Sequence, residues 1–387
     1  MRFPEFSGEW ERKKLGDIGT TLIGLTYSPQ DVVPSDGTIV LRSSNIKGGL
    51  LDYTDLVRVN KKIKESIITR ANDILICARN GSARLIGKNA ILKDSDCGHT
   101  FGAFMMVYRS EDNPFVHQLL STKRYYSQVA ENLGARINQI TTSDLNSFEF
   151  SFPQSQKEKV KIAGMLSLLD ERIATQIKVI EKLESLIRGI ITDVNSSRLA
   201  QCKQVYLRDL LTEQYEKNTN NYEVCSVSVS QGVINQIDYL GRSFAAKEVL
   251  HYNVVNCGDI VYTKSPTGEF PYGIVKRSDI NKPVAVSPLY GVYRPINDYV
   301  GRYLHLYFKS PINAKNYLHK LIQKGAKNTI NITNQHFLDN RILIPEKGWL
   351  ENIVNFAATI EAKIVTENKV LQALQAQKDY LLSKMFI

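Results

Sequence analysis

Residues 131–153 read ENLGARINQITTSDLNSFEFSFP, and 192 positions later residues 323–345 read QKGAKNTINITNQHFLDNRILIP. Both stretches contain Gly-Ala followed by a basic residue, then an Ile-Thr pair, and both end in an apolar run closed by proline. Two shorter matches precede them in the same order: LGDI (15–18) with LRDL (207–210), and ANDILI (71–76) with CGDIVY (257–262). Ordered matches at nearly constant spacing indicate that the chain consists of two duplicated halves.

Each half has the pattern of a mixed α/β module followed by one long helix. In the first half, apolar and β-branched runs between turn-forming residues predict strands at Thr38–Ser44, Asp73–Ala78 and Ala103–Arg109. A cap residue followed by proline predicts a helix from Asn113-Pro114 to Gly134, and Ser310-Pro311 predicts its counterpart, ending at Gly325.

The stretch that follows each module carries a heptad pattern. From Gln156 to Val194 the seam residues are Ile162, Leu166, Leu169, Ile173, Gln176, Ile180, Leu183, Ile187 and Ile190. From Leu350 to Phe386 the same frame, shifted by 191, includes Ile353, Ile360, Ile364, Glu367, Leu371, Leu374 and Leu381. Such a seam is typical of a coiled coil. Because neither helix can bury its apolar stripe alone, we expect each to pack against the other.

The two polar seam residues predict how these helices are oriented. Gln176 and Glu367 occupy equivalent positions near the middle of their helices. Antiparallel packing of repeat-related helices brings two such residues together, so we predict an antiparallel pair in which Gln176 lies near Glu367 and fixes the register. The alternative is that both side chains are partly exposed to solvent and unpaired.

Composition narrows the class of protein. The chain has 387 residues, a length that predicts two or three domains. It contains no apolar run long enough for a transmembrane helix. The charged start lacks the apolar core of a secretory signal, and the five cysteines are too scattered for a disulfide framework. We therefore expect a cytoplasmic protein.

Net charge points to a polyanionic partner. The formal charge is +10, and the excess is spread along the chain: residues 201–346 hold 17 Lys and Arg against 12 Asp and Glu, and residues 1–155 hold 19 against 17. This distribution excludes a basic tail as the site that binds the polyanion. A basic face on a folded module is the alternative that is compatible with it.

No catalytic or metal-binding pattern is evident in the sequence. The stretch GSARLIGK (81–88) has five residues between its glycines, where a phosphate-binding loop needs four. The stretch SPLY (287–290) departs from the amino-methyltransferase motif at Leu289 and is interpreted as part of a strand. The six histidines lack metal-ligand spacing. We expect no catalysis, cofactor or metal in this chain.

Several loops carry the side chains that contact DNA in other proteins. Forked donors and amides read base edges, while Lys, Arg, Ser and Thr bind phosphates. The candidates in the first module are Arg42, Ser43, Ser44, Asn45, Lys47, Arg79, Asn80, Ser82, Arg84, Arg136 and Asn138. Those in the second are Ser228, Ser230, Gln231, Lys264, Ser265, Thr267, Lys324, Lys327 and Asn328. The alternative is that these are solvated or helix-capping turns.

The whole chain resembles the specificity subunits of type I restriction-modification systems. The resemblance rests on Trp10 with ERKKLGDI (11–18), LRSSNIKGG (41–49), NDILICARNGSARLIGKNAIL (72–92), CGDIVYTKSPTGEFPYGIVKR (257–277), the GAR and GAK loops, and FPQSQKEKVKIAGMLSLLDERI (152–173). Each motif is loose, and the specific part is their order and duplication.

The resemblance implies an α+β fold with two duplicated α/β target recognition domains. These would span 1–155 and 201–346, separated by long helices at 156–200 and 347–387 that form an antiparallel coiled coil with pseudo-two-fold symmetry. Each domain would read one half of a bipartite, asymmetric site in double-stranded DNA.

The same resemblance implies partners that carry the chemistry. Two modification subunits would methylate adenines with S-adenosylmethionine, and restriction subunits would translocate and cut DNA with ATP and Mg. None of that chemistry would reside in this chain.

The residues by themselves are also compatible with two other classes of protein. A coiled-coil scaffold with two protein-binding modules would carry exposed apolar loops, whereas these loops are rich in Arg, Lys, Asn and Ser. A stand-alone methyltransferase or nuclease would need the cofactor or metal motifs that the sequence lacks.

Overall fold

The computed structural model describes residues 2–133, 138–196, 201–240, 248–324 and 330–386. The chain forms two compact units, Met1–Ile177 with Lys369–Ile387, and Lys178–Asn368. Both boundaries between the units fall inside the long helices, so each unit contains one module and the adjoining ends of both helices. The finer division at residues 155, 200 and 346 stays a prediction.

The first unit is built on an antiparallel sheet. Its strand order is β2 (Thr20–Ile23), β11 (Met105–Arg109), β8 (Ile74–Cys77) and β9 (Asn89–Ile91). A second sheet has the order β10 (Thr100–Phe101), β4 (Thr38–Leu41), β7 (Val57–Val59) and β3 (Val32–Val33). Two short pairs complete the strands: β1 (Glu11–Lys14) with β12 (Glu149–Phe152), and β5 (Ile46–Lys47) with β6 (Leu50–Leu51).

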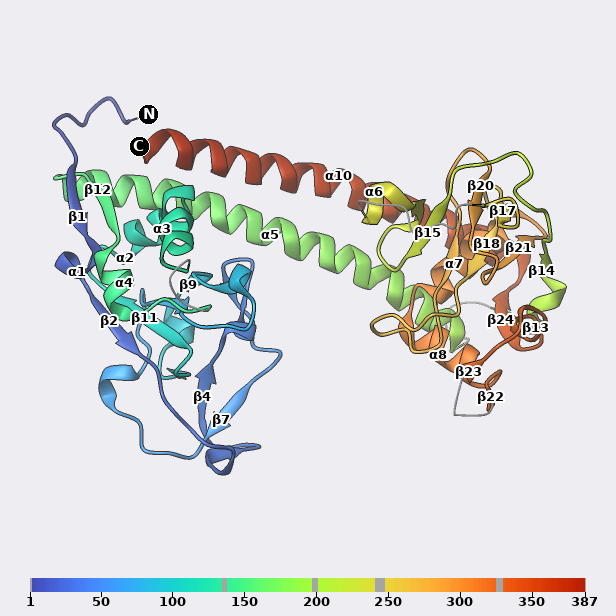
Figure 1. The fold of residues 1–387 in the computed structure, drawn as a ribbon, viewed down its shortest axis with the longest axis horizontal. Coiled ribbons are helices and arrows are strands. Elements are labelled where there is room, and N and C mark those ends of the chain that lie inside the picture. The colour runs from blue at the N-terminus through green and yellow to red at the C-terminus, as the bar shows by residue number, and fades with distance from the viewer. Residues whose placement is uncertain (1, 134–137, 197–200, 241–247, 325–329, 387) are drawn as a thin grey trace. The chain divides into compact units, whose positions relative to one another are not determined.

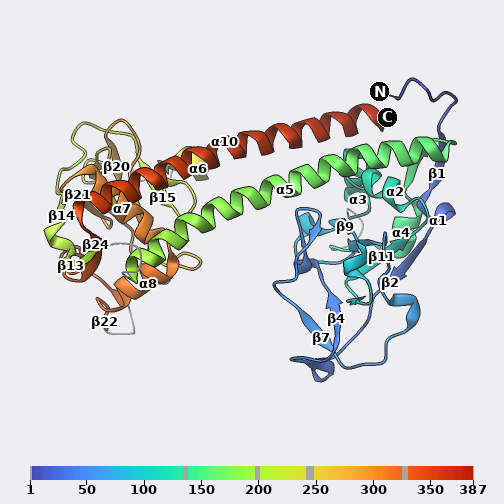
Figure 2. The ribbon, with the colours of Figure 1, turned by 180° about the vertical axis from the view of Figure 1, so that it is seen from behind.

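The alternation of side chains along β8 and β11 builds two cores on opposite faces of this sheet. One face packs on the helices α1 (Leu15–Ile18), α2 (Asn113–Leu119), α3 (Lys123–Leu133) and α4 (Thr142–Ser147), through residues such as Ile74, Ile76, Met106 and Tyr108. The other face packs on the second sheet, through Leu75, Cys77, Met105 and Val107. Figures 1 and 2 show α2 and α3 on the α5 side of the sheet, with β4 and β7 on the far side.

The second unit repeats this plan. Its main sheet has the order β14 (Leu211–Glu213), β21 (Gly291–Pro295), β18 (Ile260–Tyr262) and β19 (Val275–Arg277). The register is also repeated, because Tyr108 pairs with Ile74 in the first unit and Tyr293 pairs with Ile260 in the second. This equivalence confirms the duplication at the level of hydrogen-bonded strands.

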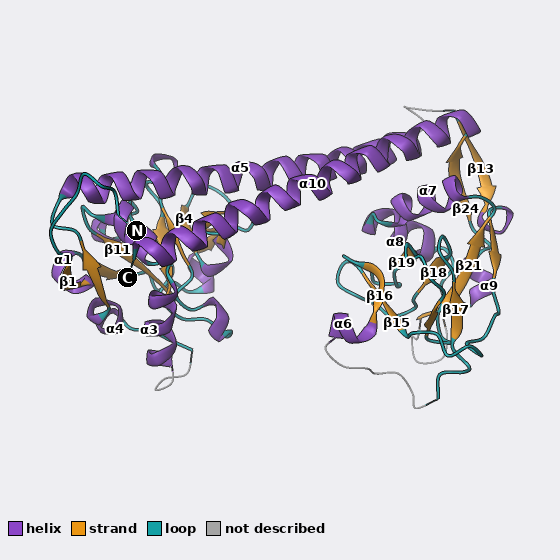
Figure 3. Ribbon diagram, turned by 90° about the horizontal axis from the view of Figure 1, so that it is seen from above, coloured by secondary structure: helices purple, strands orange, loops and turns teal. Residues whose placement is uncertain are grey.

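The remaining elements of the second unit surround that sheet. The paired strands are β13 (Cys202–Tyr206) with β24 (Arg341–Pro345), β15 (Cys225–Ser228) with β16 (Gly232–Asn235), β17 (Asn253–Val255) with β20 (Val284–Val286), and β22 (Gln323–Lys324) with β23 (Ile330–Asn331). The helices are α6 (Gln236–Leu240), α7 (Asp298–Phe308), α8 (Pro311–His319) and α9 (Asn334–Phe337). Figure 3 shows α7 and α8 on the side of the module toward α10, and α7 shares its core with that helix.

The long helices α5 (Gln156–Asn195) and α10 (Lys347–Met385) pack together in opposite directions. In the first unit the start of α5, at Ile162 and Leu166, shares a core with the end of α10, at Leu382 and Met385. In the second unit the end of α5 shares a core with the start of α10. The predicted fold class, with two β-rich domains and two packed long helices, is therefore confirmed.

Every predicted seam residue is buried or half-buried. Lys378, also in the α10 seam, reaches across the pair to Asp170 of α5. Glu367 pairs with Lys363 one turn earlier in its own helix. Gln176 belongs to the first unit and Glu367 to the second, and each unit is described by itself. The predicted contact between these two residues therefore stays a prediction. Among the described residues, no helix combines the length and apolarity needed to cross a membrane.

Several predicted elements are wrong in detail. The helix predicted over 113–134 is two helices, α2 and α3. The hydroxyls of Ser121 and Thr122 donate to the carbonyls of His117 and Leu119, and these hydrogen bonds end α2. Ser310, whose side chain caps α8, therefore begins the counterpart of α3; the counterpart of α2 is α7. The predicted end of this second-half helix at Gly325 is also wrong, because α8 ends at His319 and β22 follows it.

Two further corrections concern strands. Residues 287–290 form a turn before β21 instead of a strand. The strand predicted at Thr38–Ser44 ends at Leu41, and Ser43–Asn45 form a 3-10 turn.

Candidate nucleic-acid interface

A groove of about 1070 Å³ opens in the first unit where loops from distant parts of the chain meet. Six predicted DNA-contact residues line it: Arg42, Ser43, Ser44, Arg79, Asn80 and Asn138. They come from the turn after β4, the loop after β8 and the segment before α4. Its apolar wall includes Leu25, Tyr27, Val32, Val57 and Phe104. The fold thus brings together side chains that the sequence places nearly 100 residues apart.

Hydrogen bonds between the loops hold the groove in shape. The Asn80 side-chain amide donates to Ser43 Oγ at 2.9 Å, and the Asn80 N–H donates to the Asn138 carbonyl at 3.3 Å. Asn138 in turn donates from Nδ2 to the Gly81 carbonyl at 3.0 Å, and its φ of +51° is one that Asn tolerates better than most residues. Asn80 and Asn138 therefore serve the architecture of the groove as well as its polar surface.

Arg79 projects into solvent over an exposed aromatic ring. Its guanidinium carbon lies 5.1 Å from the centroid of the Phe104 ring, a cation–π contact. The backbone N–H groups of Ala78 and Arg79 both donate to the Phe104 carbonyl at 3.0 Å, which ties the two loops together at this point. No carboxylate among the described residues pairs with this guanidinium. Arg79 is therefore held in place by Phe104, and no described residue accepts a hydrogen bond from its guanidinium.

Phe104 is the groove residue that sequence reasoning missed. The strand predicted over Ala103–Arg109 places Phe104 inside the sheet, but β11 begins at Met105 and the Phe104 side chain is 59% exposed. The turn in which Met105 N–H donates to the Gly102 carbonyl turns Phe104 outward. Gly102 is the nearest sequence signal for such a turn.

Arg42 also lines the groove, and its guanidinium is paired with a carboxylate. Its Nη2 donates to Asp55 Oδ2 at 2.8 Å, while its Nε is buried without a hydrogen-bond partner among the described residues. Asp55 is 64% exposed in its side chain. Together the two side chains present a donor and an acceptor to the groove.

Not every candidate of the first module reaches this groove. Ser82, Arg84 and Lys47 are exposed outside its lining, and Lys47 pairs with Asp52, an interaction that lowers the pKa of that carboxyl. Asn45 is fully buried: its amide donates to the carbonyls of Asp52 and Asp55 and accepts from Arg42 N–H. The assignment of Asn45 to base contact is therefore corrected, because its hydrogen-bonding capacity is used inside the loop.

The second unit exposes a smaller set of candidates. Lys264, Ser265 and Thr267 are exposed on the loop after β18, where partial burial lowers the pKa of Lys264. Ser230 and Gln231 are exposed at the β15–β16 hairpin. Ser228 is buried and its Oγ accepts from Gln231 N–H, so it shapes the hairpin, and its assignment to DNA contact is corrected.

Four further candidates cannot be placed by their side chains. Arg136, Lys327 and Asn328 lie outside the described residues, and the described part of Lys324 is its backbone in β22.

Two histidines, the buried His117 and the half-buried His305, have lowered pKa values. Burial lowers the pKa of His117 to about 4 and that of His305 to about 3, with nearby Lys276 and Lys309 adding to the second shift. No cluster of three or more His, Cys, Asp or Glu suited to a metal ion lies in the described part of the chain. Ala83–Leu85, within the glycine-containing stretch 81–88, form a 3-10 turn.

Comparisons with known proteins agree on one family. A model described as "Type I restriction modification DNA specificity domain" matches residues 7–185. The specificity subunit of the EcoKI type I restriction enzyme of Escherichia coli K12 is 22% identical over 97% of this chain and 88% of its own length. The StySPI specificity subunit of Salmonella potsdam is 26% identical over 51% of this chain and 40% of its own length.

Solved structures share the fold. The S subunit of a type I restriction-modification system from M. genitalium superposes with a TM-score of 0.59 at 14% identity, covering 100% of this chain and 99% of that one. A chain from a study of type I complex assembly superposes with a TM-score of 0.50 at 12% identity, covering 98% of each. The family model, both curated relatives and the fold therefore agree that this chain is similar to the specificity subunits of type I restriction-modification systems.

Proposed function

We propose that this chain recognises a bipartite, asymmetric sequence in double-stranded DNA, one half with each module. As a type I specificity subunit it is non-catalytic and directs its complex to the DNA target site. This role replaces the two alternatives of a protein-binding scaffold and a stand-alone enzyme.

The groove of the first unit is the observation that carries the proposal. It gathers two arginines, two serines and two asparagines from three separate loops and holds them by hydrogen bonds. Guanidinium and amide groups match the donor and acceptor patterns of base edges, and serine hydroxyls bind phosphates. Arg79 is our first candidate for base reading in the first half-site, because no described residue accepts a hydrogen bond from its guanidinium.

The duplication supports a split and asymmetric target. The two modules share strand order and register, so their loops leave equivalent strand ends. The loop after β8 carries Arg79 and Asn80, whereas the loop after β18 carries Lys264 and Ser265. Because hydrogen-bonding groups of different geometry select different bases, we infer two different half-sites.

The long helices support docking of partner subunits. They expose large apolar side chains, including Val160, Leu168, Phe356 and Val365. Apolar surface on a helix that already has one partner is typical of a further interface. We propose that two modification subunits, which methylate adenine with S-adenosylmethionine, dock there, and that restriction subunits using ATP and Mg complete the complex. We expect this complex in the cytoplasm, where its five free thiols stay reduced.

Methylation mapping tests the proposal. The chain, co-expressed with its modification subunits, is compared with Arg79→Ala and Lys264→Ala by long-read sequencing of modified DNA. We expect Arg79→Ala to weaken or relax one half of the methylated sequence and Lys264→Ala the other. Loss of one or two well-placed contacts costs about 1–3 kcal/mol of discrimination. Uniform loss at both halves, or unchanged motifs in both variants, would contradict the two-module assignment.

A further inference from the structure

Phe104 and Leu289 occupy the same position in the two duplicated modules. Ile76 and Tyr262 are equivalent residues of ANDILI and CGDIVY, and they pair with Met106 and Gly291 respectively. Two residues before each of those partners stand Phe104 and Leu289. Leu289 thus lies in the turn at 287–290. This is the stretch SPLY, which no cofactor-binding motif accompanies in the sequence.

Both side chains point outward despite their apolar character. Phe104 is 59% exposed and Leu289 is 73% exposed. Local turns hold them: Met105 N–H donates to the Gly102 carbonyl, while Leu289 N–H donates to Ser287 Oγ and Tyr290 N–H donates to the Ser287 carbonyl. Different turn sequences therefore give the same outcome, an apolar side chain displayed just before the central strand.

Each of the two residues stands beside a base-contact loop. In an antiparallel pair, the chain leaving one strand and the chain entering its neighbour lie at the same end. Arg79 lies three residues beyond Ile76, and Lys264 lies two residues beyond Tyr262. The contact of Arg79 with the Phe104 ring confirms this proximity in the first module. A single exposed apolar residue is ordinary on a protein surface. The observation that supports a shared role is that an exposed apolar residue recurs at the equivalent position of both modules.

We propose that Phe104 and Leu289 are specificity-determining residues, one in each half-site, that pack on the C5-methyl group of thymine in the major groove. That methyl is the apolar group which the major groove displays, and it distinguishes T·A from the other base pairs. Phe104 also positions Arg79, because the cation–π contact restrains the guanidinium while its N–H groups can still donate to guanine. This inference rests on the proposed function and names the chemistry that its two modules read.

Removing the methyl group from the DNA tests the contact directly. The assembled methyltransferase complex binds duplexes that carry the mapped target, with each thymine replaced in turn by uracil, which lacks only that methyl. Wild-type binding should weaken about fourfold at one thymine of each half-site, the ratio expected for one buried methyl group. Phe104→Ala should abolish the effect of uracil in the first half-site alone, and Leu289→Ala in the second alone.

Several controls make the result specific. The two alanine variants control for each other, and Ile312→Ala changes a residue that is 70% exposed on α8 in the second module. Phe104→Leu keeps an apolar side chain and should retain sensitivity to the methyl group. Circular dichroism and thermal unfolding of each variant should match the wild-type chain, since all the changed side chains are exposed.

The outcomes separate this inference from the proposed function. If uracil weakens wild-type and Phe104→Ala equally at every position, or if neither is affected, the thymine contact is wrong. The same inference is overturned if Phe104→Ala alters both half-sites. Should Arg79→Ala still alter one half-site in that case, the proposed function stands without this contact. If Arg79→Ala and Lys264→Ala leave both half-sites unchanged, the proposed function fails as well.

Discussion

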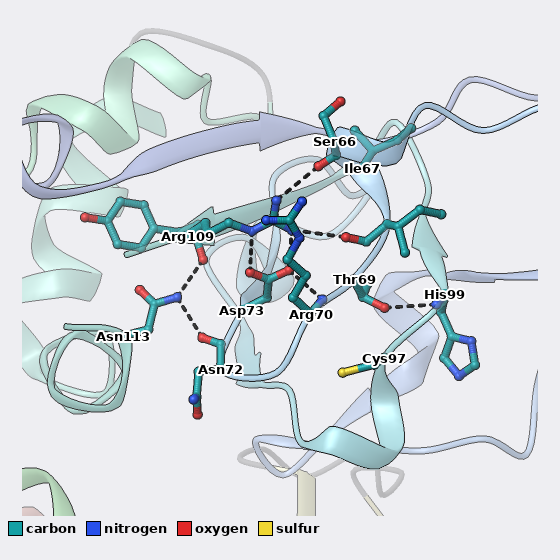
Figure 4. A network of polar contacts seen from close by, with 12 residues as sticks. Ser66, Ile67, Thr69, Arg70, Asn72, Asp73, Cys97, His99, Arg109 and Asn113 are labelled. Carbon is teal, nitrogen blue, oxygen red and sulfur yellow. Dashed lines mark hydrogen bonds and ion pairs between the residues drawn. The ribbon is translucent and has the colours of Figure 1, made fainter. Parts of the chain in front are cut away.

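Asp73 and Arg109 form a two-pronged ion pair that joins the start of β8 to the end of β11. Arg109 Nε and Nη2 lie 2.7 and 2.6 Å from the Asp73 carboxylate oxygens, and the same guanidinium donates to the carbonyls of Ser66 and Ile68 (Figure 4). In the second module Asp259 and Arg294 repeat the pair at 3.2 Å. Asn72 and Gly258, just before the acids, both have positive φ, so the turn is repeated too. This pair explains why Asn-Asp-Ile and Gly-Asp-Ile recur although the loops beyond the strands differ.

Breaking the Asp73–Arg109 pair should destabilise the first unit. The Asp73 side chain is 2% exposed, and removing one partner of a buried pair leaves the other charge uncompensated. We expect Asp73→Asn to lower the free energy of unfolding by about 3 kcal/mol. Trp10 lies in this unit and Trp349 in the other, so urea unfolding followed by fluorescence in a Trp349→Phe background reports on the first unit.

The exposed Asp94 supplies the control for that measurement. Asp94→Asn changes a surface carboxylate and should alter the unfolding free energy by less than about 0.5 kcal/mol. An Asp73→Asn chain as stable as Asp94→Asn would show that the ion pair contributes nothing to the module.

Acidification should destabilise the second unit through His305. Burial, and then the charges of Lys276 and Lys309, lower its pKa to about 3, whereas an unfolded histidine titrates near 6.5. As pH falls below about 6.5, the unfolded chain binds a proton that the folded chain does not, so stability is lost toward acid. Between pH 7.5 and 5.0, His305 should account for about 2 kcal/mol of the decrease.

Comparison of variants isolates this effect from other titrations. The loss of stability between the two pH values should be smaller in His305→Gln than in the wild-type chain, by thermal or urea unfolding. His251 is exposed, so His251→Gln should leave the pH dependence unchanged. Equal pH dependence in His305→Gln and wild type would mean that His305 is not held neutral.

A charge in the helix seam should disrupt the packing of α5 on α10. Ile180 is buried in α5, and the neighbouring Val179 is exposed. Ile180→Glu should cost about 3 kcal/mol and lower the yield of complex with the modification subunits, because an unpaired charge enters an apolar seam. Val179→Glu places the same charge on the outer face and should leave thermal unfolding within about 1 °C of wild type. Equal stability of the two variants would argue against the heptad frame.

Exchange of a whole module should change half of the target. Replacing residues 201–346 with the corresponding segment of a relative keeps both long helices and the first module. We expect methylation mapping to show one half of the recognised sequence altered and the other retained, because each module reads its half-site through its own loops. A chimera in which both halves change would show that the modules do not read independently.

Local patterns accounted for much of this architecture. Heptad spacing predicted both long helices, and the ordered matches predicted the duplication that the strand registers confirm. These features are readable because helical periodicity and repeats depend on residues close in sequence or on self-similarity. The helix break at Ser121 and Thr122 was not predicted, since side-chain hydrogen bonds to the backbone compete with a helix without changing its apolar pattern.

The candidate interface depended more on tertiary structure. The residue types of the base-contact loops were evident from the sequence. However, Asn45 is buried whereas Arg42, three residues earlier, lines the groove. The exposure of Phe104 contradicts its place in an apolar run. Burial of a loop residue depends on which distant segment covers it, and a linear pattern carries no information on that.

The amino-acid sequence by itself thus determined two repeated modules, two coiled-coil helices and the polar chemistry of the loops. The tertiary structure decided that Arg42, Arg79 and Asn138 meet in one groove, and that Phe104 stands at its edge beneath Arg79. The physical reason is that strand pairing between distant segments, such as β8 with β11, sets which loops emerge at the same edge of the sheet.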